Sequence, residues 1–131
     1  MSQENVELAH RAYDAINRRD LGAFLALMDA DVEAVPRVVA IEGRYHGHDG
    51  IRRWWEHLVG FVPDLVIAIV AVRDLGDLTL ATVRMRGRGA GSETPLDEAL
   101  WSAVEWRDGK CVWWANYGTE AEAVEAVGLP E

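Results

Sequence analysis

Three charged side chains in the C-terminal half of this 131-residue chain could do chemistry. Glu98 is a candidate general acid or base, because burial in an apolar hollow raises a carboxyl pKa towards neutrality, while a neighbouring cation lowers it again. Arg84 and Arg86 are candidates for holding a carboxylate or enolate through the fixed donor fork of a guanidinium. The alternatives stay open here: a surface glutamate or a structural Glu98–Arg84 pair, and arginines on a solvated sheet edge or a dimer interface.

Two histidines form a second candidate site. His46 and His48 flank Gly47, and their spacing of two residues could suit a metal ion. No carboxylate cluster accompanies them, so we interpret the segment as a turn in which His48 or Asp49 caps a helix, and we predict no metal site. The chain also lacks a Gly-x-Ser-x-Gly motif, a phosphate loop and a dinucleotide fingerprint, and we predict no cofactor.

The elements that must position these residues are clearest near the C-terminus. The runs Leu100 to Arg107 and Lys110 to Gly118 both alternate, and Asp108-Gly109 separates them. Asp-Gly between two alternating runs is the strongest short-range signal for a β-hairpin. Thr119 to Glu122 is a capping box that predicts a terminal helix ending at Gly128.

Further strands and helices follow from the periodicity of the apolar residues. The period of two predicts strands over 65–73, 78–88 and 96–107, after a short strand over 31–36. Helical spacing predicts a first helix, a short second helix capped by Asp20, and a third helix whose apolar face consists of Ile51, Trp54, Trp55, Leu58 and Val59. Helices followed by grouped strands indicate an α+β fold, with the helices packed on one side of a curved antiparallel sheet.

Composition restricts the class of protein. The chain is long enough for one domain, which we place at residues 1–131. A net charge of -9 argues against a nucleic-acid groove and against binding to anionic membranes. Cys111 is the only cysteine, so no intrachain disulfide can form, and the N-terminus has no signal-like segment. We therefore expect a cytoplasmic protein.

Several segments, in this order, resemble a known family: Asn5-Val6-Glu7, Ala12–Leu21, Asp29–Glu33, Tyr45–Arg53, Arg84–Gly89 and Arg107–Lys110. They are similar to the nuclear-transport-factor-2-like (NTF2-like) superfamily, and more narrowly to its SnoaL-like branch. The resemblance implies a cone, in which three helices wrap one face of a curved antiparallel sheet and a C-terminal helix follows. The superfamily contains isomerases, polyketide cyclases, dehydratases, epoxide hydrolases and proteins that only bind ligands, so fold alone assigns no activity.

The resemblance also implies which side chains line the cone. Leu100, Ser102, Val104 and Trp106 point inward on one strand, as do Trp114 and Asn116 on the next. Alternation places Glu98 on the same side, and the neighbouring strand is expected to add Thr82, Arg84 and Arg86.

Within this arrangement, Tyr13, Trp55 and Trp114 could floor a pocket for a flat apolar ligand, or could be ordinary core residues. Ser102 and Asn116 could supply neutral hydrogen bonds to the ligand, or could be satisfied locally.

The opposite side of the sheet is expected to be apolar. Its predicted members are Ala81, Val83, Met85, Trp101, Trp113, Ala115 and Tyr117. A sheet that is buried on both faces is what a back-to-back dimer requires, so we predict a homodimer through the outer sheet face.

The chain departs from the enzymes it resembles. Ala34 stands at or near the position of the general base of ketosteroid isomerases, and Ser102 stands near their second acidic donor, so that mechanism is not expected here. The first hypothesis is a protein that binds a small apolar or weakly anionic ligand, with cofactor-independent isomerase, cyclase, lyase or hydrolase activity through Glu98 and Arg84. The alternative is a non-catalytic module for ligand binding or dimerisation.

Overall fold

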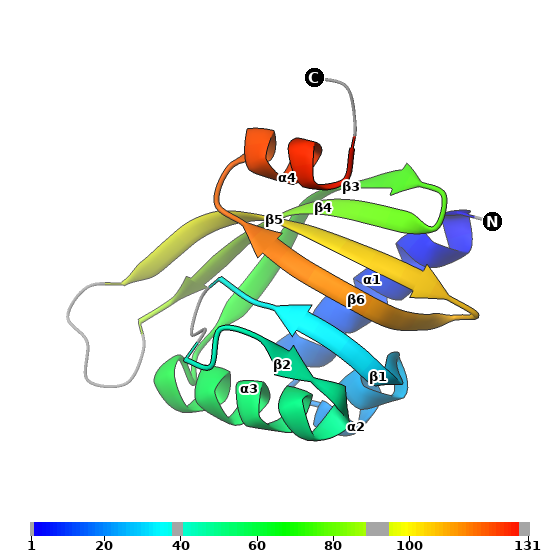
Figure 1. Cartoon of the computed structure of the whole chain (residues 1–131). Coiled ribbons are helices and arrows are strands. Elements are labelled where there is room, and N and C mark those ends of the chain that lie inside the picture. Colours follow the sequence, from blue (N-terminus) through cyan, green and yellow to red (C-terminus); the bar gives the residue numbers. More distant parts are fainter. Residues whose placement is uncertain (1, 38–40, 89–94, 129–131) are drawn as a thin grey trace.

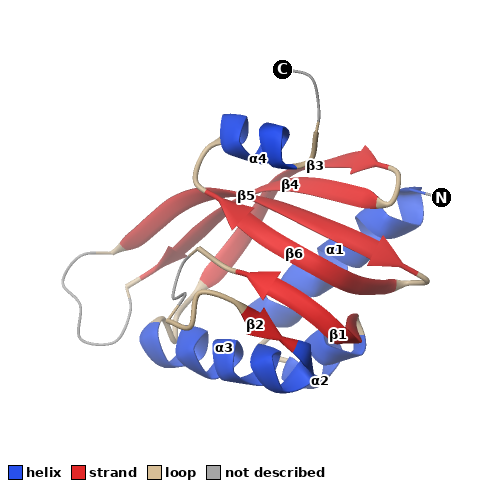
Figure 2. Ribbon diagram, viewed as in Figure 1, coloured by secondary structure: helices blue, strands red, loops and turns tan. Residues whose placement is uncertain are grey.

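A computed structural model of the chain describes residues 2–37, 41–88 and 95–128. In this part of the chain one curved sheet has the strand order β2-β1-β6-β5-β4-β3. Helices α1, α2 and α3 lie on its concave side, whereas α4 lies on its convex side (Figure 1). Figure 2 shows the same view with the helices in blue and the strands of the sheet in red. The predicted α+β architecture is confirmed, with the sheet curved but not closed into a barrel.

The predicted meander is present with nearly the expected bounds. It consists of β3 (Val66–Leu75), β4 (Leu78–Gly87), β5 (Leu96–Arg107) and β6 (Lys110–Tyr117), each antiparallel to the next. The β5–β6 turn has φ of 52° at Asp108 and 78° at Gly109. Two consecutive left-handed residues give the turn a twist that matches paired strands, which explains the Asp-Gly dipeptide.

Two more strands extend the sheet beyond β6, one of them predicted and one not. β1 (Met28–Val35) pairs in parallel with β6, and β2 (Tyr45–His46) pairs antiparallel with β1. The sequence predicted β1 three residues too late and did not predict β2, because two residues cannot show a period. Through these strands the sheet continues as far as α3, which contacts both of them.

The concave side is covered by α1 (Ser2–Asn17), α2 (Leu21–Ala26) and α3 (Gly47–Phe61). The predicted cap of α2 is confirmed, since Asp20 Oδ1 accepts a hydrogen bond of 3.0 Å from the backbone N–H of Ala23. The predicted cap of α3 is wrong. The N-cap residue is His46, which makes no side-chain cap hydrogen bond, and Asp49 lies within the first turn.

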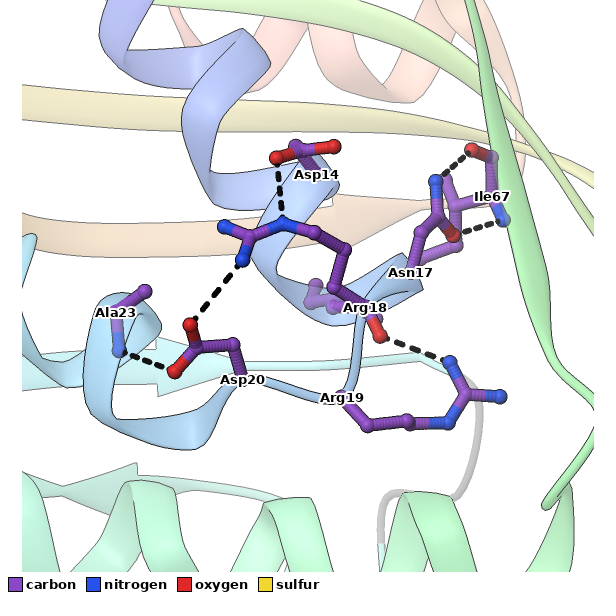
Figure 3. Close-up of polar contacts among 8 residues, drawn as sticks. Asp14, Asn17, Arg18, Arg19, Asp20, Ala23 and Ile67 are labelled. Carbon is purple, nitrogen blue, oxygen red and sulfur yellow. Dashed lines mark hydrogen bonds and ion pairs between the residues drawn. The ribbon is translucent and has the colours of Figure 1, made fainter.

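The C-terminal end of α1 is hydrogen-bonded to β3 (Figure 3). The side-chain amide of Asn17 both donates to the Ile67 carbonyl oxygen and accepts from the Ile67 N–H, at 2.8 Å each. Arg19 ends the helix with φ of 60°, and its Nη2 donates to the carbonyl oxygens of Pro63 and Leu65. These contacts hold α1 against β3, and the Ile67 side chain lines the cavity described below.

On the convex side, α4 (Glu120–Ala126) packs Ala123 and Val124 against Leu80 and Ala103. The predicted N-cap at Thr119 is confirmed, because Thr119 Oγ1 accepts a 3.2 Å hydrogen bond from the Glu122 N–H. The Glu122 carboxylate accepts from the Thr119 hydroxyl instead of its backbone N–H, so the capping box is only partly formed. None of the helices in the described residues combines the length and apolar character needed to traverse a lipid bilayer.

Candidate functional site

The concave side of the sheet encloses a cavity of about 60 Å³ against α1, α2 and α3. The helices contribute Ala9, Ala12, Tyr13, Ile16, Phe24 and Trp54, and the strands contribute Met28, Ile67, Ala81, Val83, Met85, Leu100, Ser102, Val104, Trp106, Cys111, Trp114 and Asn116. Sites for drug-sized ligands measure roughly 300–1,000 Å³. The cavity as it stands therefore suits a very small molecule, or a larger one that displaces part of the wall.

The expected orientation of β5 and β6 is confirmed. Leu100, Ser102, Val104 and Trp106 line the cavity from β5, and Trp114 and Asn116 line it from β6. Ser102 lies directly opposite Asn116 in the ladder, so their side chains are neighbours on the same face.

The expected orientation of β4 is wrong. Ala81 pairs with Ser102 and Val83 with Leu100, so Ala81, Val83 and Met85 line the cavity. Residues directly opposite in an antiparallel ladder share a face, and an error of one residue in the register sends every side chain to the other face. Thr82, Arg84 and Arg86 consequently lie on the convex side.

The two arginines make their ion pairs on that convex side. Arg84 Nε donates to Asp97 Oδ1 at 2.7 Å, and Arg86 Nε lies 3.6 Å from the same oxygen. The side chains of Arg84 and Asp97 remain 41% and 50% exposed. Hydrogen bonding from Arg84, together with the charges of both arginines, holds the pKa of Asp97 below its ordinary value. The arginines therefore do not form a clamp inside the cavity.

Glu98 does not meet the arginines. It lies opposite Met85 in the β4–β5 ladder, on the concave side of β5, but it is exposed near the start of the strand. The cavity-lining residues begin at Leu100, two positions further along β5. Glu98 and Arg84 therefore point to opposite faces of the sheet, and the structure does not bring them together.

Among the predicted aromatic residues, Tyr13 and Trp114 line the cavity and Trp55 does not. Trp55 is buried behind the wall, with its ring centroid 5.3 Å from that of Phe24 and 6.4 Å from that of Trp54. Both tryptophans belong to the apolar stripe of α3, but successive residues of a helix point in directions about 100° apart. Helical periodicity could show that both are buried, but not which one reaches the cavity.

The polar groups on the wall are few and neutral. Burial raises the pKa of Tyr13 to about 12, against a smaller lowering by the neighbouring Ser102. Burial also raises the pKa of Cys111. Among the described residues that line the cavity there is no carboxylate, imidazole or cationic side chain. At neutral pH the wall therefore carries no net charge and no group ready to exchange a proton.

The histidine pair lies outside the cavity. His46 is near two surface carboxylates, at 3.7 Å from Glu33 and 3.9 Å from Asp31, while His48 Nε2 is 3.0 Å from the Met28 carbonyl oxygen. In the described residues, no three His, Cys, Asp or Glu side chains are grouped as metal ligands would be. The two histidines thus serve different local contacts.

Several wall residues were not identified from the sequence as parts of a site, notably Trp54, Phe24, Met28, Val83 and Met85. One signal could have found the β4 residues. The alternate set Ala81, Val83 and Met85 is wholly apolar, whereas Thr82, Arg84 and Arg86 are polar, and the apolar set belongs against the helices.

Comparison with protein families gives a match over most of the chain. A family model described as a SnoaL-like domain matches residues 9–114. No curated protein sequence matches the chain.

Solved structures share the fold over nearly the whole length. A protein from Jannaschia sp. CCS1, assigned as a SnoaL-like polyketide cyclase, has a TM-score of 0.79 and 16% identity, covering 99% of this chain and 95% of its own. A protein from Catenulispora acidiphila with a ketosteroid isomerase-like fold, in complex with trimethylamine, has a TM-score of 0.77 and 19% identity, covering 95% and 94%. TerC co-crystallised with polyporic acid has a TM-score of 0.75 and 21% identity, covering 95% and 98%. At these identities the similarity establishes the fold.

Proposed function

The chain belongs to the SnoaL-like domain family, and from that premise we propose that it binds a small, neutral and largely apolar molecule in the cavity on the concave side of the sheet. The observation that carries this proposal is the composition of the wall. Its apolar side chains surround a few neutral polar groups, which is the usual make-up of a small-molecule site. An anionic ligand is disfavoured, because a buried charge without a partner is costly and no cationic side chain of the described residues lines this wall.

Three neutral side chains would orient the ligand. Tyr13 and Ser102 both line the cavity, and Asn116 lies across the ladder from Ser102. A hydroxyl and an amide can both donate and accept, so this group can recognise an alcohol, ketone or amide. The ligand-binding roles predicted for Tyr13, Ser102, Trp114 and Asn116 are retained in this proposal, and those for Trp55 and Arg86 are not.

Binding is tested by filling the cavity. We expect cyclopentanone, or its hydrocarbon analogue methylenecyclopentane, to bind the wild-type protein, as measured by ligand-observed NMR. Ala81→Leu adds methyl and methylene groups to the wall, and its matched control, Ala71→Leu, makes the same change at an exposed position of β3. Ala81→Leu should weaken binding at least roughly tenfold, equivalent to about 1.4 kcal/mol, while Ala71→Leu leaves it unchanged. The proposal fails if neither neutral probe binds, or if cyclopentanecarboxylate binds as well as they do.

A catalytic role remains the second candidate, and Glu98 is the residue that favours it. Its position on the concave side of β5, two residues before Leu100, leaves it facing the same way as the cavity wall. If Glu98 moves a proton to or from a ketone, the protein in deuterated water will accelerate exchange at the carbon next to the carbonyl of cyclopentanone. Glu98→Gln should abolish that acceleration and leave affinity nearly intact. An unchanged exchange rate in the presence of wild-type protein would favour binding without catalysis.

The predicted homodimer through the outer sheet face also stays a proposal. Trp101, Trp113 and Tyr117 are partly buried on that face, and α4 already covers the neighbouring Leu80 and Ala103. A second copy would have to pack beside α4 rather than over the whole sheet.

A further inference from the structure

Two tryptophans in the cavity wall have unsatisfied hydrogen-bond donors. Trp54 is 4% exposed and Trp114 is 6% exposed, and the Nε1 atom of each is buried without a hydrogen-bond partner. Buried indole N–H groups normally find an acceptor, because leaving one unpaired forfeits its interaction with water. Trp106 shows the ordinary arrangement in the same wall, since its Nε1 donates to Thr79 Oγ1 at 3.0 Å.

The two indole rings are in contact with each other in the cavity wall. Trp54 comes from α3 and Trp114 from β6, their ring centroids are 5.0 Å apart, and the ring planes meet at 64°. In an edge-to-face pair one ring supplies the face, so within this pair at most one N–H can be directed at a ring. At least one of the two donors therefore requires an acceptor from outside the pair.

The cavity beside the two indoles is the space from which such an acceptor can approach them. A volume of about 60 Å³ is well below the roughly 300–1,000 Å³ of sites for drug-sized ligands, so a larger ligand needs part of the wall to move. An indole turns about two side-chain torsions without moving the backbone, so the Trp54–Trp114 pair is a part of the wall that can yield without unfolding a helix or strand. Turning the pair would enlarge the cavity and could bring an N–H group into it.

We propose that the Trp54–Trp114 pair is the adjustable wall of the site, which turns on binding and donates an indole hydrogen bond to an acceptor oxygen of the ligand. The ligand is thereby narrowed to a neutral molecule with a carbonyl or ether oxygen set among apolar groups. An indole N–H only donates, and a carboxylate would bring a charge that this wall does not neutralise. This inference rests on the proposed binding function.

The test compares two probes of nearly the same shape, cyclopentanone with its carbonyl oxygen and methylenecyclopentane without an acceptor. The full chain is labelled with ¹⁵N, and the indole N–H resonances of Trp54 and Trp114 are assigned from Trp54→Phe and Trp114→Phe. We expect cyclopentanone to bind roughly three- to tenfold more tightly, which is the usual net effect of one hydrogen bond. It should also shift the N–H resonance of Trp54 or Trp114 downfield, while that of Trp113 on the convex side stays in place.

The variants provide a second readout. Trp54→Phe or Trp114→Phe should bring the affinity ratio of the two probes close to one, whereas Trp113→Phe should preserve it. If a cavity variant does not fold, the shift of the indole resonance in the wild-type protein still decides whether an indole N–H binds the ligand. Equal binding of both probes without a shift at either indole overturns the inference and leaves the binding function standing. Failure of both probes to bind overturns the binding function itself.

Discussion

Val83 and Arg84 are adjacent in β4, yet they belong to two chemically different regions. Val83 is 2% exposed and lines the cavity with Ala81 and Met85, whereas the Arg84 side chain is 41% exposed on the convex side and pairs with Asp97. The concave region is apolar and uncharged. The convex region has exposed ion pairs, and α4 covers only part of it. The difference shows that a one-residue register decides whether a strand contributes a binding wall or a charged surface.

The largest effect should come from placing the same polar residue on both sides of β4. Val83→Gln buries an amide with no partner and loses apolar contacts, so we expect it to lower the free energy of unfolding by roughly 3 kcal/mol. Arg84→Gln removes an exposed ion pair and should cost only a small fraction of that loss. Chemical denaturation of both variants measures the contrast, and equal losses would mean that the two faces do not differ in burial.

A somewhat smaller effect on the free energy of unfolding is expected from the ionisation of Tyr13 at high pH. Its pKa in the folded protein is about 12, against an ordinary value of 10.0. Between these pH values the unfolded chain loses the phenolic proton while the folded protein keeps it, so stability is complete below pH 10 and falls as the pH rises towards 12. Two pKa units correspond to roughly 2–3 kcal/mol at 1.36 kcal/mol per unit.

Tyr13→Phe provides the control for this prediction, because it removes the titrating group and keeps the ring. The difference in unfolding free energy between wild type and Tyr13→Phe should change steeply with pH above 10 and be flat below it. A difference that is flat throughout the alkaline range would show that Tyr13 is open to water rather than enclosed in the concave region.

The smallest expected effect concerns the convex ion pair. Arg84 holds the pKa of Asp97 below its ordinary value of 3.8, so the pair contributes stability above that pH and loses it as the pH falls through the lower folded value. Arg84→Gln should move the pKa of Asp97 back upwards, as followed by NMR titration of its carboxyl carbon. Because the groups are exposed, added salt should weaken the effect in the wild type. An Asp97 titration that Arg84→Gln leaves unchanged would contradict the 2.7 Å contact between Arg84 Nε and Asp97 Oδ1.

Local features of this protein could be predicted from its sequence, whereas strand pairing and register could not. The Asp108-Gly109 turn and the N-caps at Asp20 and Thr119 were all predictable, since each depends on residues only a few positions apart. β2 was missed because its pairing with β1 brings together residues more than ten positions apart and has no local pattern. The predicted site failed at Arg84 for a related reason, because the β4–β5 register depends on how two strands meet across a long connection.

The wall residues divide in the same way. Tyr13, Ser102, Trp114 and Asn116 were expected and do line the cavity, because the orientation of β5 and β6 is transmitted through a two-residue turn. Trp54 was not distinguished from Trp55, since both satisfy the apolar period of α3. Which of them meets Trp114 depends on the rotation of α3 against the sheet, which is set by packing with β1 and α2.

Taken alone, the order of the 131 residues was enough to specify the class of fold, the hairpin and the N-caps of α2 and α4, because short-range hydrogen bonds and apolar periodicity act within a few residues. The neutral cavity, the separation of Glu98 from Arg84 and the unsatisfied Trp54–Trp114 pair emerge only when strands and helices are assembled. They depend on register and on the angles at which elements pack, and these are determined by the free energy of the whole core rather than by any local segment.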